Sequence, residues 1–388
     1  MTFEYNSDQL KEIGAIYTAT EIEQQPRLWL ETVGIIENQL QEIKSFIEKN
    51  VQSNTRIVLA GAGTSDYVGA TIADHLSKLL SRRVEVIPTT DIVSNPFDYV
   101  VDNVPTILVS FARSGNSPES VGSFDLFNQI KNIHHIVITC NAEGALAHRV
   151  KADKQHLLVL MPAESNDKGF AMTGSFTCML LAAVLIFEIA HFEENKKYAE
   201  IVARQGVSIL ENGWENVKQI CSKNPSRIVY LGSGFLRKLS QELMLKNLEL
   251  TNGSVMAMAE SVLGYRHGPK TFTNDKTVII VLASQNPYSQ LYDVDLIKEM
   301  FNDKGEHQVV VLDYQNNEIY QSNCDQYYSI NGQEVPAVYT ALNYVLYGQM
   351  VGLYNSIRLG FTPDNPVPSG AVNRVVQGVT IHPYKHSS

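Results

Sequence analysis

Two segments of this chain that start 171 residues apart follow one pattern of residue types, since 227 − 56 equals 171. Residues 56–66 read Arg-Ile-Val-Leu-Ala-Gly-Ala-Gly-Thr-Ser-Asp, and residues 227–237 read Arg-Ile-Val-Tyr-Leu-Gly-Ser-Gly-Phe-Leu-Arg. The same shift relates the apolar runs that begin at Thr106 and Thr277. An apolar run that ends in a glycine turn predicts a buried strand followed by the start of a helix. We therefore expect two copies of one α/β unit.

Strands and helices are predicted to alternate through both copies, which is typical of βαβ units. Such units form a parallel sheet with helices on both faces. The predicted fold class is therefore α/β, with two tandem three-layer α/β/α domains. The predicted strands cover 57–60, 84–88, 106–111, 136–140, 228–231, 277–282 and 308–312, and the predicted helices cover 66–80, 121–130, 174–192, 195–222, 236–250, 294–303 and 337–359.

The N-terminal residues 1–54 read as helical. After Pro26, which suits the first turn of a helix, apolar residues recur at spacings of three and four and form a narrow seam. The seam fits either a helix that lies on its own domain or an oligomer contact. It consists of Trp29, Val33, Ile36, Leu40, Ile43 and Ile47. The predicted divisions are a helical extension over 1–50, a first domain over 51–210, and a second domain with a C-terminal tail over 211–388.

Composition limits the classes of function. Apolar residues make up 44% of the chain and charged residues 19%, as in a soluble globular protein. The net charge of −10 argues against a general nucleic-acid or anionic-membrane surface, although a local pocket can still hold a small anion. The four cysteines form no Cys-x-x-Cys pair, so neither a zinc site nor a disulfide framework is expected. The first residues, Met-Thr-Phe-Glu-Tyr-Asn, lack the basic and apolar regions of a signal peptide, so the cytoplasm is the expected compartment.

One apolar run, residues 176–187, resembles a membrane span. A span needs about 20 apolar residues, so this shorter run predicts a buried helix instead.

The glycine turn at residues 61–65 is the first candidate for ligand binding. A dinucleotide fingerprint would place a third glycine where Asp66 stands, although Glu85 follows at the distance of a ribose-binding acid. Asp66 would oppose a pyrophosphate. Thr64 and Ser65 instead offer hydroxyls at a helix start, which suits a single phosphate.

A second polar turn follows the strand predicted at 106–111. It contains Arg113, Ser114, Asn116 and Ser117. Serine and asparagine are common turn formers, but a guanidinium meets phosphate oxygens in a bidentate manner. The second copy reads Ala-Ser-Gln-Asn-Pro at this place and has Phe-Leu in place of the Thr-Ser pair, so the phosphate-type chemistry is expected in the first copy.

In place of these phosphate-type residues, the second copy has acidic residues and a histidine. Glu242 and Glu249 are seven apart and share one face of a predicted helix. Such a pair is often a solvated face, but the neighbouring leucines favour a carboxylate partly removed from water. His267 precedes Gly-Pro on a predicted loop, where histidines are often functional.

The motifs Gly-Ala-Gly-Thr-Ser, Ala-Arg-Ser-Gly-Asn-Ser and Arg-His-Gly-Pro together resemble those of double sugar-isomerase (SIS) domain proteins. The resemblance covers residues 50–388 and is strongest to the galactosamine-6-phosphate deaminase/isomerase group, also labelled tagatose-6-phosphate ketose/aldose isomerase. The isomerase half of glucosamine-6-phosphate synthase is another relative, whose glutaminase domain has no counterpart here.

The resemblance implies roles for individual residues. Glu249 matches the proton-transferring glutamate, and His267 matches a ring-opening histidine that the neighbouring subunit donates in that family. Gln377, with Arg374 three residues earlier, stands where the synthase has a lysine, which puts a lysine-based step in doubt. The residues expected to bind phosphate are Thr64, Ser65, Arg113, Ser114, Asn116 and Ser117. Arg113 and the preceding alanine replace glutamine and serine of the synthase.

The activity that the resemblance implies is conversion of galactosamine 6-phosphate to tagatose 6-phosphate and ammonia. One alternative is aldose–ketose isomerisation without deamination. An alternative of another class is a non-catalytic sugar-phosphate-binding regulator. No cofactor and no metal is expected, and the implied assembly is a homodimer or higher homo-oligomer with shared active sites.

Overall fold

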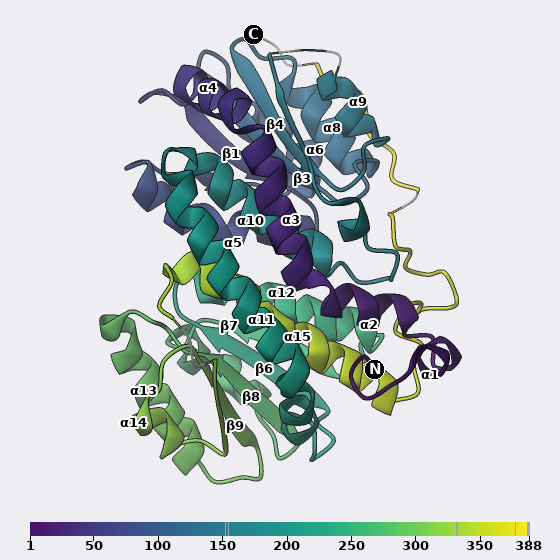
Figure 1. The fold of residues 1–388 in the computed structure, drawn as a ribbon, viewed down its shortest axis with the longest axis vertical. Coiled ribbons are helices and arrows are strands. Elements are labelled where there is room, and N and C mark those ends of the chain that lie inside the picture. Colours follow the sequence, from purple (N-terminus) through teal and green to yellow (C-terminus); the bar gives the residue numbers. More distant parts are fainter. Residues whose placement is uncertain (152, 154, 331–332, 377, 386–388) are drawn as a thin grey trace. The chain divides into compact units, whose positions relative to one another are not determined.

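The computed structural model describes residues 1–388 except 152, 154, 331–332, 377 and 386–388. The chain divides into two compact units (Figure 1). The first-copy unit comprises Arg27–Asp167, Met172–Ala199 and Ser369–Ser388. The second-copy unit comprises Met1–Pro26, Lys168–Ala171 and Glu200–Pro368. The domain divisions expected from the sequence stay a prediction.

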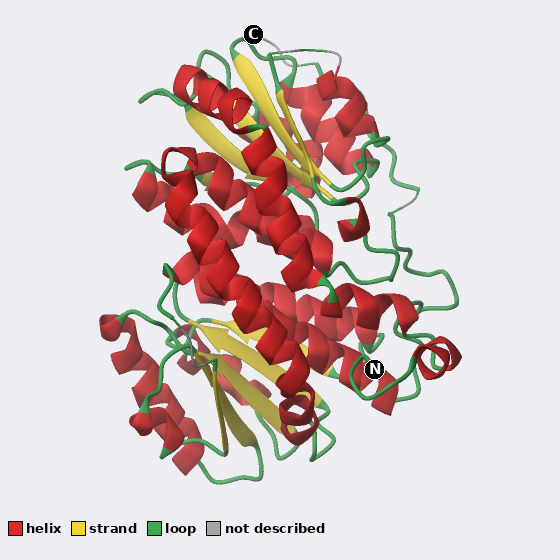
Figure 2. Cartoon of the chain, viewed as in Figure 1, coloured by secondary structure: helices red, strands yellow, loops and turns green. Residues whose placement is uncertain are grey.

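Each unit has a five-stranded parallel sheet with helices on its faces, as the α/β prediction required (Figure 2). The first sheet has the order β2-β1-β3-β4-β5 and the second the order β10-β9-β8-β6-β7. The strands are β1 (Arg56–Ala60), β2 (Glu85–Val86), β3 (Thr106–Ala112), β4 (Ile133–Thr139), β5 (Leu157–Leu160), β6 (Arg227–Gly232), β7 (Met256–Glu260), β8 (Thr277–Leu282), β9 (Gln308–Asp313) and β10 (Gln326–Ser329).

The repeat seen in the sequence recurs in the pairing of the strands. Arg56 of β1 lies opposite Thr106 of β3, and Arg227 of β6 lies opposite Thr277 of β8. The strands β1, β3, β6 and β8 are buried on both faces, which explains their continuous apolar runs.

Helices cover both faces of the first sheet. α5 (Thr64–Leu79) packs with α10 (Gly174–Phe187) on one face, where Gly69 allows close approach to Leu59 and Phe111. The other face buries Val58 and Leu108 under α6 (Thr89–Ser94) and α8 (Pro118–Phe127). The remaining elements of this unit are α3 (Gln25–Asn38), α4 (Leu40–Asn50), α7 (Pro96–Tyr99), α9 (Ala145–Lys151), η1 (Ala163–Ser165) and η2 (Ile189–His191).

The second sheet is covered in the same way. α12 (Phe235–Leu250) packs on β6 and β7 beside α15 (Ala337–Arg358). On the opposite face, Val229 and Ile279 pack with Leu296 of α13 (Pro287–Asn302). The remaining elements are α1 (Ser7–Glu12), α2 (Ile16–Glu23), η3 (Gly264–Arg266), η4 (Pro269–Phe272) and α14 (Glu318–Gln321), and α11 (Phe192–Ile220) begins in the first-copy unit and ends in the second.

Most of the apolar seam on α3 and α4 is buried within the chain. Trp29, Ile36 and Ile43 are fully buried, and Val33 nearly so. This burial supports the interpretation of the seam as a helix that lies on its own domain.

The apolar run at 176–187 forms most of α10, all of whose residues are buried, which confirms the buried-helix prediction. Among the described residues, no single helix is both long and apolar enough to cross a membrane, and the pair that α10 makes with the following helices is bent by 87°. The predicted helix 174–192 was too long, because α10 ends at Phe187 and a short 3-10 turn follows. The prediction of 294–303 was too short, because α13 already starts at Pro287.

Candidate active site

Topology brings the two polar turns of the first copy together. β1 and β3 are neighbours in the sheet, and the chain leaves them toward β2 on one side and β4 on the other. The carboxyl ends of two such strands form a crevice, which is the usual place for a ligand in an open parallel sheet. The turn at residues 61–65 and the turn at residues 113–117 flank this crevice.

The first turn is set by its glycines. A Cβ on Gly61 would lie 2.3 Å from the backbone carbonyl carbon of Ser65, so only glycine fits there. Gly63 has φ 56°, a left-handed conformation that also favours glycine. The turn places Thr64 and Ser65 in the first turn of α5, where free N–H groups and the helix dipole favour an anion.

The second turn ends at the start of α8. Ser117 precedes Pro118 as the helix cap, and its Oγ donates to Ser120 Oγ at 2.7 Å. The backbone N–H of Asn116 donates to Ser114 Oγ at 3.3 Å, while the side-chain oxygen of Asn116 accepts from the N–H of Ala145 at 2.9 Å. Asn116 therefore fixes the turn to the start of α9, a structural task beside its predicted contact with phosphate.

Arg113 and Arg374 lie together in the first-copy unit. Arg113 is buried and donates to the backbone carbonyl of Arg374. The guanidinium of Arg374 in turn donates to the carbonyl of Asp167 at 2.8 Å and to Asn166 Oδ1 at 3.3 Å. The carboxylate of Asp167 is itself buried and accepts hydrogen bonds from Thr173, Gly174 and Ser175 at the start of α10. The C-terminal tail is thus fastened to the unit that carries the polar turns, and Gln377 lies outside the described residues.

The second-copy unit holds a row of charged residues on α12. Lys246 Nζ lies 2.5 Å from Glu249 Oε2 and 3.5 Å from Glu242 Oε1. The side chains of Lys246 and Glu242 are fully buried, whereas 26% of the Glu249 side chain is exposed. Glu249 is therefore a carboxylate that a small molecule can reach, held in place by a buried ammonium.

Sequence reasoning missed Lys246. Its signal was the spacing, because a lysine four residues after Glu242 and three before Glu249 can contact both carboxylates on one helix face.

His267 follows η3 on an exposed loop. The residues on either side of it are held by one carboxylate of α13: Arg266 Nε lies 2.7 Å from Glu299 Oε2, and Lys270 Nζ lies 2.6 Å from Glu299 Oε1. Lys270 and Arg266 lower the pKa of Glu299. The loop is also anchored by the buried ring of Tyr265. The imidazole is therefore presented to solvent on a fixed loop.

Glu249 and His267 lie on elements that cover opposite faces of the second sheet. Right-handed connections from β6 to β7 and from β8 to β9 run in opposite directions along the sheet, so α12 and α13 are on opposite faces. Glu249 is on α12, and the loop of His267 is held to α13. No hydrogen bond or ion pair joins the two residues within the described part of the chain.

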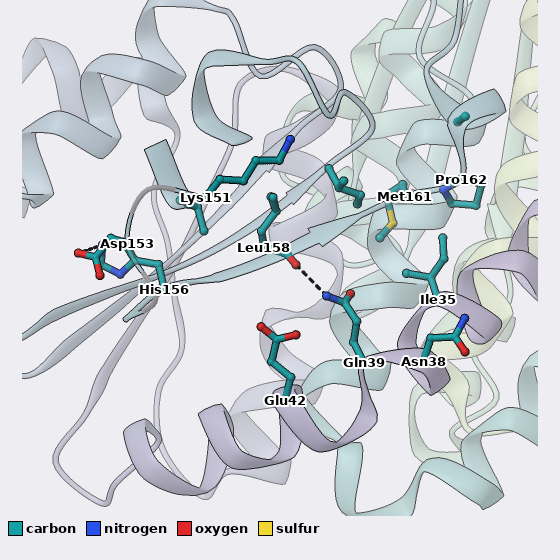
Figure 3. A pocket seen from close by; sticks show the side chains of 13 residues that line it. Ile35, Asn38, Gln39, Glu42, Lys151, Asp153, His156, Leu158, Met161 and Pro162 are labelled. Atoms are coloured by element: carbon teal, nitrogen blue, oxygen red, sulfur yellow. Dashed lines mark hydrogen bonds and ion pairs between the residues drawn. The ribbon is translucent and has the colours of Figure 1, made fainter. Parts of the chain in front are cut away.

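A separate cavity of about 930 Å³ lies beside the edge strand β5 (Figure 3). It is lined by residues such as Gln39, His156 and Leu158, and Gln39 donates to the Leu158 carbonyl at 3.2 Å. None of the predicted site residues lines it. Despite its size, this cavity is away from the crevice between β1 and β3 and is not the candidate active site.

The fold is that of a tandem α/β protein, with the predicted phosphate-binding residues in one copy and the predicted acid–base residues in the other. The model of the SIS domain matches residues 51–189. A Streptomyces coelicolor protein proposed to be D-galactosamine-6-phosphate deaminase AgaS is 43% identical, over 95% of this chain and 96% of its own length. D-galactosamine-6-phosphate deaminase AgaS of a Shewanella species is 38% identical, over 98% and 95%. The chain therefore belongs to the SIS domain family.

Solved structures agree. The crystal structure of a Clostridium novyi protein, for which tagatose-6-phosphate ketose/aldose isomerase activity has been proposed, superposes with a TM-score of 0.96 at 42% identity and covers 99% of both chains.

Proposed function

We propose that this chain is a galactosamine-6-phosphate deaminase that produces tagatose 6-phosphate and ammonia. The observation that carries the proposal is the partly exposed Glu249 carboxylate beside the buried Lys246, in a chain that also has two polar turns at the switch point of its first sheet. Relatives of almost the same length that share 38–43% of its residues are named for this activity.

The phosphate group is assigned to the first-copy turns. The hydroxyls of Thr64, Ser65, Ser114 and Ser117 and the guanidinium of Arg113 are the donors, because phosphate oxygens accept hydrogen bonds and carry negative charge. Because these donors bind the phosphate group and not the reacting carbons, they orient the sugar without taking part in the chemistry. Arg374 holds the tail near these donors through the Asp167 carbonyl.

The proton transfers are assigned to His267 and Glu249. His267 moves a proton between O1 and the ring oxygen, which opens the ring. Glu249 then removes the proton from C2 and returns one to C1, while O1 gains a proton and the amino nitrogen loses one. The product is a ketimine, and water adds to its C2 and releases ammonia. Positioned acid–base groups of this kind contribute about 10²–10⁴-fold. Lys246 keeps the Glu249 carboxylate in one orientation.

The placement of Glu249 and His267 on opposite faces supports a site completed by a second copy of the chain. The test is complementation between two inactive variants, Glu249→Gln and His267→Ala. When the two are unfolded together and refolded as a mixture, hybrids with one intact shared site should regain part of the wild-type activity. Each variant refolded alone is the control. A mixture as inactive as its components would contradict shared sites.

Aldose–ketose isomerisation without deamination is the second candidate, because a solved relative is associated with that activity. A neutral aldose has no amino group to lose, so the same residues would give a ketose. The two are separated by offering galactosamine 6-phosphate and measuring ammonia and tagatose 6-phosphate. Equal amounts of both products are expected. Interconversion of aldose and ketose phosphates without ammonia would overturn the deaminase proposal in favour of the isomerase.

The third class, a regulator that only binds sugar phosphates, is tested with Glu249→Gln. The enzyme proposal expects this variant to lose turnover and to keep its affinity for the sugar phosphate. Absence of turnover in the wild-type chain with every hexosamine and hexose phosphate would favour the regulator. Charged sugar phosphates do not cross a bilayer unaided, so the proposal also places the enzyme in the cytoplasm.

A further inference from the structure

The second copy keeps the backbone geometry of the phosphate turn, although Phe235 and Leu236 stand where the first copy has the hydroxyls of Thr64 and Ser65. Gly234 has φ 61°, close to the 56° of Gly63. A Cβ on Gly232 would lie 2.6 Å from Leu236 Cβ, a close approach like that at Gly61. β6 and β8 are neighbours from which the chain departs in opposite directions, so the second sheet has a crevice at the equivalent place.

A carboxylate of the protein bridges the two turns at this crevice. Asp293 projects from α13 and is fully buried. Its Oδ1 accepts from Ser233 Oγ at 3.0 Å, in the turn after β6, and its Oδ2 accepts from the N–H of Ser284 at 2.9 Å, two residues after the end of β8. A hydroxyl and a backbone N–H at the carboxyl ends of neighbouring strands are also the donors that a phosphate uses.

Asp293 has no cation partner to explain its burial, since it forms no ion pair among the described residues. Burial raises the pKa of Asp293 to about 6, and the charge of Asp313 acts in the same direction. An isolated charge is costly to bury unless it is hydrogen-bonded. The turn donors therefore supply the main stabilisation of this carboxylate.

The first copy has no acid at the matching positions. The shift of 171 places Gly122 opposite Asp293, because 293 − 171 equals 122. If the helix-start prolines are matched instead, the shift is 287 − 118, or 169, and Phe124 is opposite. The first copy instead carries the buried cation Arg113 at the place of Ser284. The two crevices thus differ in the sign of the charge that the protein supplies.

We infer that Asp293 is a built-in anion that fills the second copy's counterpart of the phosphate crevice and thereby restricts each chain to one sugar phosphate. Removal of its carboxylate opens a second site, whose ligand class is a phosphate monoester or inorganic phosphate. The inference concerns binding alone and does not depend on the reaction proposed above.

The test compares Asp293→Ala with Asp295→Ala, a matched control that removes an exposed acid from the same helix. The probe is inorganic phosphate at constant ionic strength, and the readout is the midpoint of thermal unfolding. Ligand that binds only the folded state raises this midpoint. The wild type and Asp295→Ala should show the same rise with phosphate. Asp293→Ala should unfold at a lower temperature without phosphate and show a rise several degrees larger.

An equal phosphate response in Asp293→Ala and the wild type would overturn the inference. Asp293→Asn tests the steric part, because its amide still fills the crevice and should prevent the additional response; a rise as large as that of Asp293→Ala would contradict it. If the alanine variant does not fold even in phosphate, Asp293→Ser is put through the same titration with the same expected result. No turnover is measured, so failure here is distinct from failure of the proposed function.

Discussion

Acid should destabilise the first-copy unit through one buried histidine. His135 on β4 is fully buried, and neither ring nitrogen has a hydrogen-bond partner among the described residues. Its ring stacks on Phe124 with centroids 3.8 Å apart and meets the edge of His156 at 4.8 Å. Burial, followed by the charges of His156 and His134, holds the pKa of His135 well below 6.5. The folded chain therefore keeps this imidazole neutral at a pH where the unfolded chain protonates it.

The direction in which stability changes with pH follows from which state of the chain binds the proton. Below the unfolded pKa of about 6.5 the unfolded state binds the proton and the folded state does not, so stability falls as the pH falls toward the folded pKa. Above that window the contribution is constant. For each pH unit below about 6.5, one imidazole that stays neutral in the folded state lowers the free energy of unfolding by about 1.4 kcal/mol, which gives about 2 kcal/mol at about pH 5. His156, whose pKa burial also lowers, adds to the loss because its Nδ1 accepts from the N–H of His135.

The perturbation is His135→Leu, which removes the titration at similar volume. At neutral pH the lost stacking of about 0.5–1.5 kcal/mol opposes the relief of two unpaired polar atoms, so little net change is expected. Urea unfolding followed by circular dichroism at about pH 7.5 and pH 5 measures the free energy of unfolding. The variant should lose about 2 kcal/mol less than the wild type between these values. His382→Gln, an exposed control, should behave as the wild type. Equal acid losses in His135→Leu and the wild type would refute the argument.

Three further predictions concern the site and its support. Glu299→Gln weakens the ion pairs with Arg266 and Lys270, which hold the loop of the proposed ring-opening histidine. Steady-state kinetics should show kcat/KM lowered by about 10–100-fold, and calorimetry should show an unchanged unfolding midpoint. Gly61→Ala should lower the free energy of unfolding by about 1–3 kcal/mol because its Cβ meets backbone at 2.3 Å, whereas Gly34→Ala, with open space on a helix, should raise it by about 0.5–1 kcal/mol; urea titration of both checks this contrast. Lys246→Met should cost about 3–5 kcal/mol by leaving the Glu242 carboxylate buried without its cation, and adding Glu242→Leu should restore stability but not turnover.

The sequence predicted the central strands and missed most of the edge strands. β1, β3, β6 and β8 are buried on both faces, so their residues read as apolar runs with no alternation. The strands β5, β7 and β10 were not predicted, and β2 was predicted too long. All four are edge strands, and β7 and β10 are only partly buried along their length. A half-covered strand such as β10, Gln-Tyr-Tyr-Ser, needs no apolar run, whereas β5 reads Leu-Leu-Val-Leu and was overlooked despite its apolar run.

The candidate site likewise has features that the sequence could predict and features that it could not. Glycine turns can be predicted because close backbone contact permits only one residue type, as at Gly61. The start of α13 was also encoded locally, since Asn286 caps it by accepting from the N–H groups of Tyr288 and Ser289. The partners of Glu249 and His267 were not encoded locally, because the role of Lys246 depends on its burial and that of Glu299 on a long-range contact. The sequence alone does not show that Lys246 is completely buried and therefore paired with Glu249. Glu299 is 32 residues from His267 in the sequence, since 299 − 267 equals 32.

The two crevices show why a repeat can stay visible while its functions separate. A Cβ on Gly61 or Gly232 would lie less than 3 Å from atoms of the following helix, so a substitution at either position disturbs the fold. Side chains that point into the crevice are under no such constraint. The first copy has Arg113 at the position of Ser284, and in the second copy the Asp293 carboxylate accepts from the Ser233 hydroxyl and the Ser284 N–H. The pattern that repeats at a shift of 171 is therefore the part of each unit that packing fixes.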